Sequence, residues 1–218
     1  MQAKRHRTIP RPAVVVLLAL IGVVSSDGTA LAQDRMPPIT ADKLTDAQLA
    51  AVAEFEAARG RGVDGPFTPL LRSPEVMNRA RAMGDYLRFR SVLPERLSEF
   101  VILLTARHWT QQYEWFVHHP IALKAGLPPE TARAIADGRR PDRLTDDEAI
   151  LYDFCLELQR NQGVSDSTYE RAVVRFGEQG VIDTVGIVGY YTMLAMVLNA
   201  TRTPLPAGTP LPLLPFPR

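Results

Sequence analysis

The chain has 218 residues, 46% of them hydrophobic, and residues 33–218 hold 21 basic and 23 acidic side chains, a net charge of −2. A nearly neutral chain lacks the electrostatic footprint of a protein that binds nucleic acid or an anionic membrane surface, so neither partner is expected. Cys155 is the single cysteine in the sequence, which excludes an internal disulfide and a dithiol mechanism within one chain. We interpret it as a small buried apolar residue.

The N-terminus has the order of a secretory signal peptide. Four basic residues precede an apolar run, Ala13–Val24, and the small residues Ala30 and Ala32 stand just before Gln33. The run is about a dozen residues long, shorter than the roughly 20 that a permanent membrane-spanning helix requires. We therefore predict that residues 1–32 are removed and that the mature protein is periplasmic or secreted, with no stable membrane insertion. A retained membrane anchor is the alternative.

Local signals place the helices of the first part of the chain. The leader Gln33–Thr40 contains proline and is expected to be mobile. Thr45 and Gln48 fit a capping box at the start of an amphipathic helix. Glycines from Gly60 onward end that helix.

The central part of the chain is also helical by pattern. Ser73 is a natural N-cap, and Pro94 opens a helix with a wide apolar face. The segment HWTQQ, residues 108–112, predicts a bend or a break. A helix resumes after it and ends at Gly126, with Pro120 tolerated only if a second break lies near it.

The remaining helices follow the same logic. Thr145 and Glu148 fit a second capping box. Gly177 ends a short helix, and the next segment, Thr184–Thr201, contains no charged residue, which is typical of a helix buried in a core or in an oligomer interface.

No segment alternates between apolar and polar residues, so the predicted fold class is all-α. The length of the chain after the signal peptide suits one domain, which we place at residues 33–206. Residues 207–218 are a Pro-rich C-terminal tail and are expected to be extended.

The stretch Glu99–Gly126 gathers the residues most able to do chemistry. Glu114 and His118 are four positions apart and so share one helix face. Glu99 lies in an apolar helical run, where a carboxylate is costly unless it is paired, and its helix can fold back to bring it beside His118. A carboxylate beside an imidazole is a general acid–base pair, so these three are the candidate catalytic residues. We expect them to meet in one cavity, where pairing raises the imidazole pKa.

Other interpretations of these residues stay open. A structural ion pair would give the same spacing. A metal site is less favoured, because the spacing is not HExxH and adjacent His118 and His119 point in different directions, so no metal or other cofactor is expected. Arg107 lies where the two helical pieces meet and could grip a substrate carboxylate or form a structural ion pair. Trp115 and Tyr191 are core residues by default, but they are candidates to line a substrate pocket.

Residues 106–127, ARHWTQQYEWFVHHPIALKAGL, resemble the signature of the carboxymuconolactone decarboxylase-like family, which is related to the alkylhydroperoxidase D-like (AhpD-like) proteins. Residues 65–76, 83–100 and 188–206 resemble other helical segments of this family. The resemblance covers about residues 40–206. It implies an AhpD-like helical bundle that assembles into homo-oligomers through long apolar helices.

The resemblance also implies roles for residues. Glu99 and His118 stand at the glutamate and histidine positions of the thiol-dependent peroxidase branch, but Gln111 and Glu114 stand at its two cysteine positions. The chain therefore resembles the branch without the CxxC pair. By this resemblance the reaction is cofactor-free decarboxylation of a small carboxylated lactone, with His118 as proton donor, Glu114 or Glu99 orienting it, and Arg107 holding a substrate carboxylate.

Three classes of function remain open. The first is a lyase or isomerase that acts on a small carboxylated lactone or a related acid. The second is a peroxidase-like (peroxiredoxin-type) oxidoreductase, which would need an external thiol or a metal. The third is a non-catalytic protein that binds a small molecule or serves as an oligomeric scaffold. The export signal counts against the lactone decarboxylation known for the family as the literal reaction, because that step takes place inside the cell. A shared fold does not determine the substrate.

Overall fold

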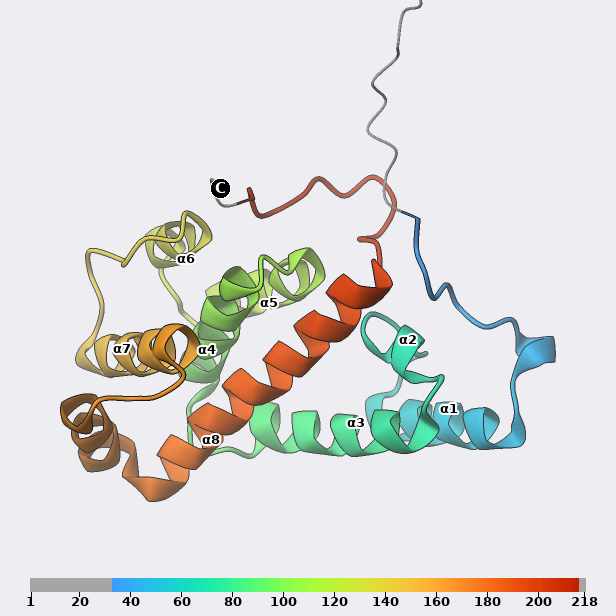
Figure 1. The fold of residues 1–218 in the computed structure, drawn as a ribbon, viewed down its shortest axis with the longest axis horizontal. Coiled ribbons are helices and arrows are strands. Elements are labelled where there is room, and N and C mark those ends of the chain that lie inside the picture. Colours follow the sequence, from blue (N-terminus) through green and yellow to red (C-terminus); the bar gives the residue numbers. More distant parts are fainter. Residues whose placement is uncertain (1–32, 216–218) are drawn as a thin grey trace, which may run out of the picture. The chain divides into compact units, whose positions relative to one another are not determined.

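The computed structural model describes residues 33–215, so the predicted signal peptide lies outside the described residues. The described residues belong to one compact unit. They form helices and no strand, which confirms the all-α prediction (Figure 1). In chain order the helices are the 3₁₀ helix η1 (Ala41–Lys43), α1 (Asp46–Arg59), α2 (Phe67–Leu70), α3 (Pro74–Phe89), α4 (Glu95–His108), α5 (Gln112–Lys124), α6 (Pro129–Ala136), α7 (Asp146–Asn161) and α8 (Asp166–Thr201).

Helix boundaries follow the capping signals. Thr45 and Gln48 form the predicted capping box at α1, and Thr145 and Glu148 form the same motif at α7. Both boxes satisfy backbone N–H groups that have no partner within their own helix. Gly60 follows α1 with a φ of 65°, a left-handed conformation that glycine adopts without the steric cost of a Cβ atom.

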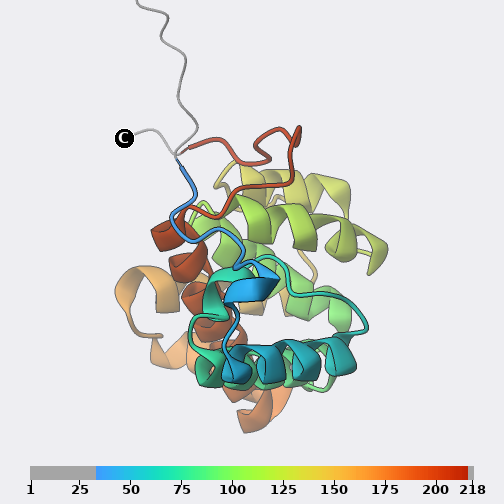
Figure 2. The same cartoon turned by 90° about the vertical axis from the view of Figure 1, so that its right-hand side faces the viewer.

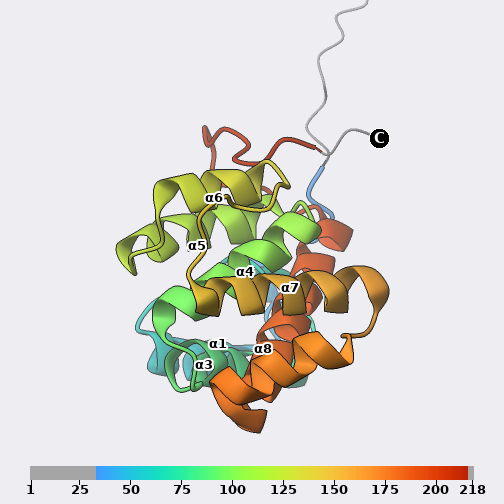
Figure 3. The same cartoon turned by 90° about the vertical axis from the view of Figure 1, so that its left-hand side faces the viewer.

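Helix α4 is the centre of the core. It packs against α3, α5, α6, α7 and α8. Four consecutive side chains, Phe100 to Leu103, are fully buried although they point to different sides of the helix. A helix that is apolar all round is stable when other helices cover each side, and Figure 3 shows α5 and α7 on two of these sides.

The long helix α8 supplies much of the remaining core. Gly177 has φ 71° and ψ 171° and divides α8 into two helical pieces, as predicted. The second piece contains the uncharged segment Thr184–Thr201, and its inner face includes Ile187 and Leu198. Length and hydropathy alone would allow α8 to cross a membrane, but 56% of its most apolar stretch is buried within the fold. We interpret it as a core helix that packs on α3, α4 and α7 (Figure 1).

Both ends of the described chain pack onto the helices. The segment that was expected to be mobile is held at Arg35, whose backbone N–H donates to the carbonyl of Thr201 over 2.8 Å. After α8 the chain runs over α5, where the Gln112 side chain pairs with both backbone groups of Leu213 at 2.9 Å (Figure 2). Leu213 is 1% exposed and belongs to the main core. The segment after residue 206 therefore contributes a side chain to the core.

Pro120 lies inside α5, which continues to Lys124 without the predicted second break. Proline cannot donate a hydrogen bond to the carbonyl four residues earlier, that of Phe116. Both residues are exposed, so water can bind this carbonyl and the helix tolerates the missing bond.

Candidate active site

The turn between α4 and α5 orients the two helices that carry the candidate residues. Helix α4 ends at His108, as the HWTQQ segment predicts, and Gln111 is the N-cap of α5. The Gln111 side chain accepts hydrogen bonds from the backbone N–H groups of Tyr113 and Glu114, at 2.5 and 3.3 Å. Its amide nitrogen donates to Asn199 of α8 at 3.0 Å. The turn is therefore held against the core as well as capped.

Glu99, Glu114 and His118 meet between α4 and α5, as predicted. His118 Nδ1 lies 2.6 Å from Glu99 Oε2, and His118 Nε2 lies 3.5 Å from Glu114 Oε2. The three residues are 2%, 3% and 4% exposed, in the order Glu99, Glu114, His118. One carboxyl group thus stands at each ring nitrogen, which fixes the orientation of the imidazole.

Arg88 belongs to this site and was missed from the sequence. Its Nη2 atom, on α3, lies 3.5 Å from Glu99 Oε1, the carboxylate oxygen that does not contact His118. Arg88 and Glu99 lie on different helices, so no i,i+3 or i,i+4 spacing within one helix indicates their contact. An arginine between Leu87 and Phe89 also looks like any surface cation of an amphipathic helix. The one signal in the sequence that could have indicated Arg88 is its place within residues 83–100, which resemble a helical segment of the family.

Two tyrosines of α8 complete the wall of the site. The rings of Tyr191 and His118 meet edge to face, with centroids 4.9 Å apart and an interplanar angle of 86°. Tyr190 packs edge to face on Tyr191 at 5.1 Å. A Cβ atom at Gly84 of α3 would lie 2.3 Å from the Tyr190 hydroxyl, so glycine at this position lets α8 approach α3. Tyr191 thus lies where a residue lining the pocket was expected.

The surroundings of His118 favour the neutral imidazole. Burial lowers the pKa of His118 more than its hydrogen bond to Glu99 raises it, and the charge of Arg88 adds to the lowering. The predicted rise in this pKa is therefore wrong, because the ring is desolvated and its carboxylate partner also faces a guanidinium group. A neutral ring that donates from Nδ1 to Glu99 presents a lone pair at Nε2, so His118 can act as a base.

The surroundings of Glu114 favour the protonated form of its carboxyl group. Burial raises its pKa from 4.5 to about 8, Arg88 opposes this rise, and Glu99 adds to it. The carboxyl group is therefore mostly protonated at neutral pH. Its Oε1 atom is buried and has no hydrogen-bond partner among the described residues. The site thus combines a neutral base and a neutral acid, which together can take a proton from one substrate atom and give one to another.

A cavity of about 460 Å³, here called the Glu–His cavity, lies beside these groups. Its size falls within the roughly 300–1,000 Å³ of small-molecule sites. Arg59 and Arg88 both line it, and each also pairs with a carboxylate of the protein, Arg59 with Asp85 at 2.8 Å and Arg88 with Glu99 at 3.5 Å. Guanidinium groups in a cavity wall favour a ligand with acceptor oxygens, such as a carboxylate. The lining residues are Arg59, Arg61, Asp64, Pro66, Phe67, Arg88, Tyr113, Glu114, Val117, His118, Ile121, Tyr190, Tyr191 and Leu194.

Arg107 and Trp115 do not line the Glu–His cavity, although both were expected to bind substrate. Arg107 is eight positions after Glu99, so helix geometry turns it by roughly 80° from that residue. Its Nη1 atom donates to the carbonyl of Leu214 at 2.7 Å. Trp115 is buried and stacks on His119 with centroids 5.7 Å apart, which is a packing contact. The arginines that line the Glu–His cavity are Arg59, Arg61 and Arg88.

The Cys155 thiol lies outside the Glu–His cavity. Cys155 on α7 is fully buried, and burial raises the pKa of its thiol to about 12. It does not line the Glu–His cavity. Within residues 33–215, no group of three or more histidine, cysteine, aspartate or glutamate side chains is arranged to hold a metal ion.

We expect Cys155→Ala to leave any activity unchanged and to lower the free energy of unfolding by about 1–2 kcal/mol, because only packing is lost. Denaturant titration and a turnover assay on the same preparation measure both quantities. Loss of turnover in a folded variant would contradict this prediction and would favour thiol chemistry.

Comparison with family models and with curated proteins finds no match to the sequence. Solved structures do match in three dimensions. An uncharacterised peroxidase-related protein from Silicibacter sp. TM1040 superposes with a TM-score of 0.65 and 18% identity, over 80% of this chain and 92% of that one. The alkylhydroperoxidase AhpD core of an uncharacterised peroxidase-related protein from Ralstonia eutropha JMP134 has a TM-score of 0.64 and 17% identity, over 79% and 92% of the chains.

The fold is AhpD-like. A third structure agrees, that of a protein of unknown function from Agrobacterium tumefaciens whose description links it to the antioxidant defence protein AhpD. It has a TM-score of 0.58 and 15% identity, over 66% of this chain and 99% of that one. At these identities the likeness concerns the fold, and a shared fold does not determine the chemistry, so the function must be argued from the site.

Proposed function

We propose that the protein is an exported carboxymuconolactone decarboxylase-like enzyme, a cofactor-free lyase or isomerase that acts on a small carboxylated lactone or a related acid. The observation that supports this best is the pairing of neutral His118 with protonated Glu114 beside a cavity lined by arginines. Such a pair transfers protons between substrate atoms with no requirement for a metal or a redox cofactor.

In the lyase form, Arg59 and Arg88 bind the acceptor oxygens of the substrate. The bond from the carboxylate carbon to the ring breaks, CO₂ leaves, and the electron pair moves into the conjugated lactone carbonyl, where the guanidinium groups stabilise the charge. Glu114 then gives its proton to the carbon and regains one from water by way of His118 Nε2, which lies 3.5 Å from its Oε2 atom. This replaces the sequence-based assignment of His118 as the donor, because the ring is neutral. In the isomerase form, His118 removes a proton beside the carbonyl and Glu114 supplies one elsewhere.

A panel of unsaturated lactones and small carboxylic acids, incubated in D₂O without added metal, tests this proposal. Mass spectrometry detects loss of CO₂ with gain of deuterium for a lyase, and gain of deuterium alone for an isomerase. Binding of a panel member without any turnover would instead favour the non-catalytic binding protein. No binding and no turnover across the panel would contradict the proposed substrate class.

A peroxidase-like oxidoreductase is the second candidate, because two of the structures with this fold are described as peroxidase-related. Reduction of a hydroperoxide to an alcohol and water requires two electrons, which a pair of thiols supplies as it becomes a disulfide. The Glu–His cavity has no cysteine in its wall, so an external dithiol would have to supply them. Peroxide consumption that depends on an added dithiol, and persists in Cys155→Ala, would favour this candidate.

The rate of turnover should follow a bell-shaped pH profile. On the acidic side activity falls as His118 becomes protonated, and the lowered pKa places this limb below the ordinary range of histidine. On the alkaline side activity falls near pH 8 as Glu114 loses its proton. Glu114→Gln keeps the size of the side chain but cannot give up a proton, so it should show a low rate without this alkaline limb. An unchanged alkaline limb in the variant would contradict the assignment of Glu114.

The protein is also proposed to form a homo-oligomer. The outer face of α8 exposes Ile182, Val185 and Met196, and the segment Thr184–Thr201 carries no charge. A row of exposed apolar side chains along one helix favours an interface. Sedimentation velocity at micromolar concentration measures the oligomeric state, and Ile182→Lys should shift it toward the monomer. A stable monomer of the unaltered protein would contradict this proposal.

A further inference from the structure

A second cavity of about 450 Å³, here called the α4/α7 cavity, lies between α4, the end of α6 and α7. It shares no lining residue with the Glu–His cavity. On α4 its residues include Leu104 and His108, which helix geometry places roughly 140° and 180° around the axis from Glu99. The two cavities therefore lie on different faces of the same helix.

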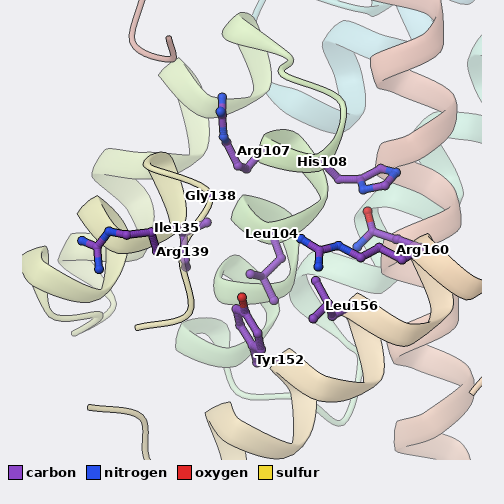
Figure 4. A pocket seen from close by; sticks show the side chains of 10 residues that line it. Leu104, Arg107, His108, Ile135, Gly138, Arg139, Tyr152, Leu156 and Arg160 are labelled. Carbon is purple, nitrogen blue, oxygen red and sulfur yellow. The ribbon is translucent and has the colours of Figure 1, made fainter. Parts of the chain in front are cut away.

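The wall of the α4/α7 cavity is mainly apolar. Leu104 of α4, Ile135 of α6, and Tyr152 and Leu156 of α7 form it, and Figure 4 shows Leu104, Leu156 and Tyr152 close together. Tyr152 and Ile135 are buried core residues, so this wall is held in place by the fold. An apolar wall of this kind favours the hydrocarbon or aromatic body of a ligand.

The charged side chains that line this cavity are all arginines, Arg107, Arg139 and Arg160. Arg160 extends from α7 toward Leu104 in Figure 4, and the residues that line the cavity include no carboxylate. His108 lies in the same wall, where burial lowers its pKa and the charge of Arg160 lowers it further. Gln159 Oε1 is buried without a partner among the described residues and adds an acceptor. Arg139 pairs with Asp137 and points outward.

We propose that the α4/α7 cavity binds a small amphipathic monocarboxylate, with its carboxylate on Arg160 and its apolar body against Leu104, Tyr152 and Leu156. The lining contains no acidic residue, so an anion meets attraction without a competing carboxylate in the wall. A cationic ligand in the same place would be repelled by Arg160. A purely polar dianion would leave the apolar wall without contacts.

Calorimetric titration of the full-length protein with octanoate tests this proposal. Octanoate should bind more tightly than butyrate, because the chain contacts the apolar wall, and more tightly than octanol or octylamine, because of the charge on its head. Arg160→Gln should weaken octanoate binding about tenfold or more, as expected for loss of a charge-assisted hydrogen bond. Arg160→Lys keeps the charge and should restore part of the affinity.

Two variants serve as controls. Arg79→Gln makes the same change of charge on the surface of α3, where Arg79 pairs with Glu75 at 81% side-chain exposure, and should bind octanoate like the unaltered protein. Arg88→Gln removes a cation from the Glu–His cavity, and octanoate binding at the α4/α7 cavity should survive it. Equal binding of octanol, no effect of Arg160→Gln, or a loss confined to Arg88→Gln would each overturn the proposal. Turnover of the lactone panel is a separate measurement, so either proposal can fail without the other.

Discussion

His118→Gln should reduce turnover in the Glu–His cavity by about 10²–10⁴-fold while leaving the protein folded. Glutamine can still donate a hydrogen bond to Glu99, so the contact at 2.6 Å has a substitute. It has no basic nitrogen, however, and cannot accept a proton from substrate or exchange one with Glu114 at 3.5 Å. The rate constant of the chemical step should therefore fall, while substrate binding through Arg59 and Arg88 changes little.

The neighbouring histidine provides a matched control. His119 is on the same helix, has the same chemistry and stacks on Trp115, but it does not line the cavity. His119→Gln should keep turnover within about threefold of the unaltered protein, because it makes no contact with reacting groups. Far-ultraviolet circular dichroism shows whether both variants keep their helices. Similar turnover in His118→Gln and His119→Gln would make His118 a structural residue.

The unaltered protein should lose about 3–5 kcal/mol of stability relative to Glu114→Gln as the pH rises from about 4.5 to 8. Burial raises the pKa of Glu114 in the folded state from 4.5 to about 8. Between these two values the folded protein keeps a proton that the unfolded chain has released. The unfolded state binds fewer protons, so the free energy of unfolding decreases with increasing pH across this window. The stabilising contribution is complete below about pH 4.5 and is lost once the pH passes about 8.

Urea titrations at pH 5, 6.5 and 8 measure this effect as the difference between the two proteins. Glutamine cannot ionise, so the variant lacks this one contribution while keeping the others. Glu170→Gln, at an exposed position of α8, is the control and should run parallel to the unaltered protein. A constant difference between Glu114→Gln and the unaltered protein at all three pH values would show that Glu114 ionises normally, and the proton donor of the proposed reaction would have to be another group.

The pH dependence of stability and the pH dependence of turnover also constrain each other. A carboxyl group that stays protonated at neutral pH in the folded state is the same group that donates in the proposed reaction. The alkaline limb of the rate profile and the pH at which stability stops falling should therefore coincide near 8. A large separation between them would mean that the limb reports a different residue.

The sequence by itself determined the features that depend on near neighbours. The capping boxes at Thr45 and Thr145, the break after His108, and the shared face of Glu114 and His118 involve residues within about four positions, where helix geometry alone sets the contact. The meeting of Glu99 with His118 spans 19 positions but was also predictable. A carboxylate in an apolar helix needs a partner, and a tight turn between two helices brings them side by side.

Tertiary packing decided the electrostatics around these residues. Arg88 reaches Glu99 because α3 lies against α4, a contact that no local spacing encodes. Helix geometry turns Arg107 away from Glu99, but the cavity that it lines exists only because α6 and α7 pack on α4. The predicted direction of the His118 pKa was wrong for the same reason. Pairing with a carboxylate is visible in the sequence, whereas the desolvation of the ring depends on the helices that pack over it, including Tyr191 of α8. Burial and charge act through space, so they follow from the assembled fold rather than from order along the chain.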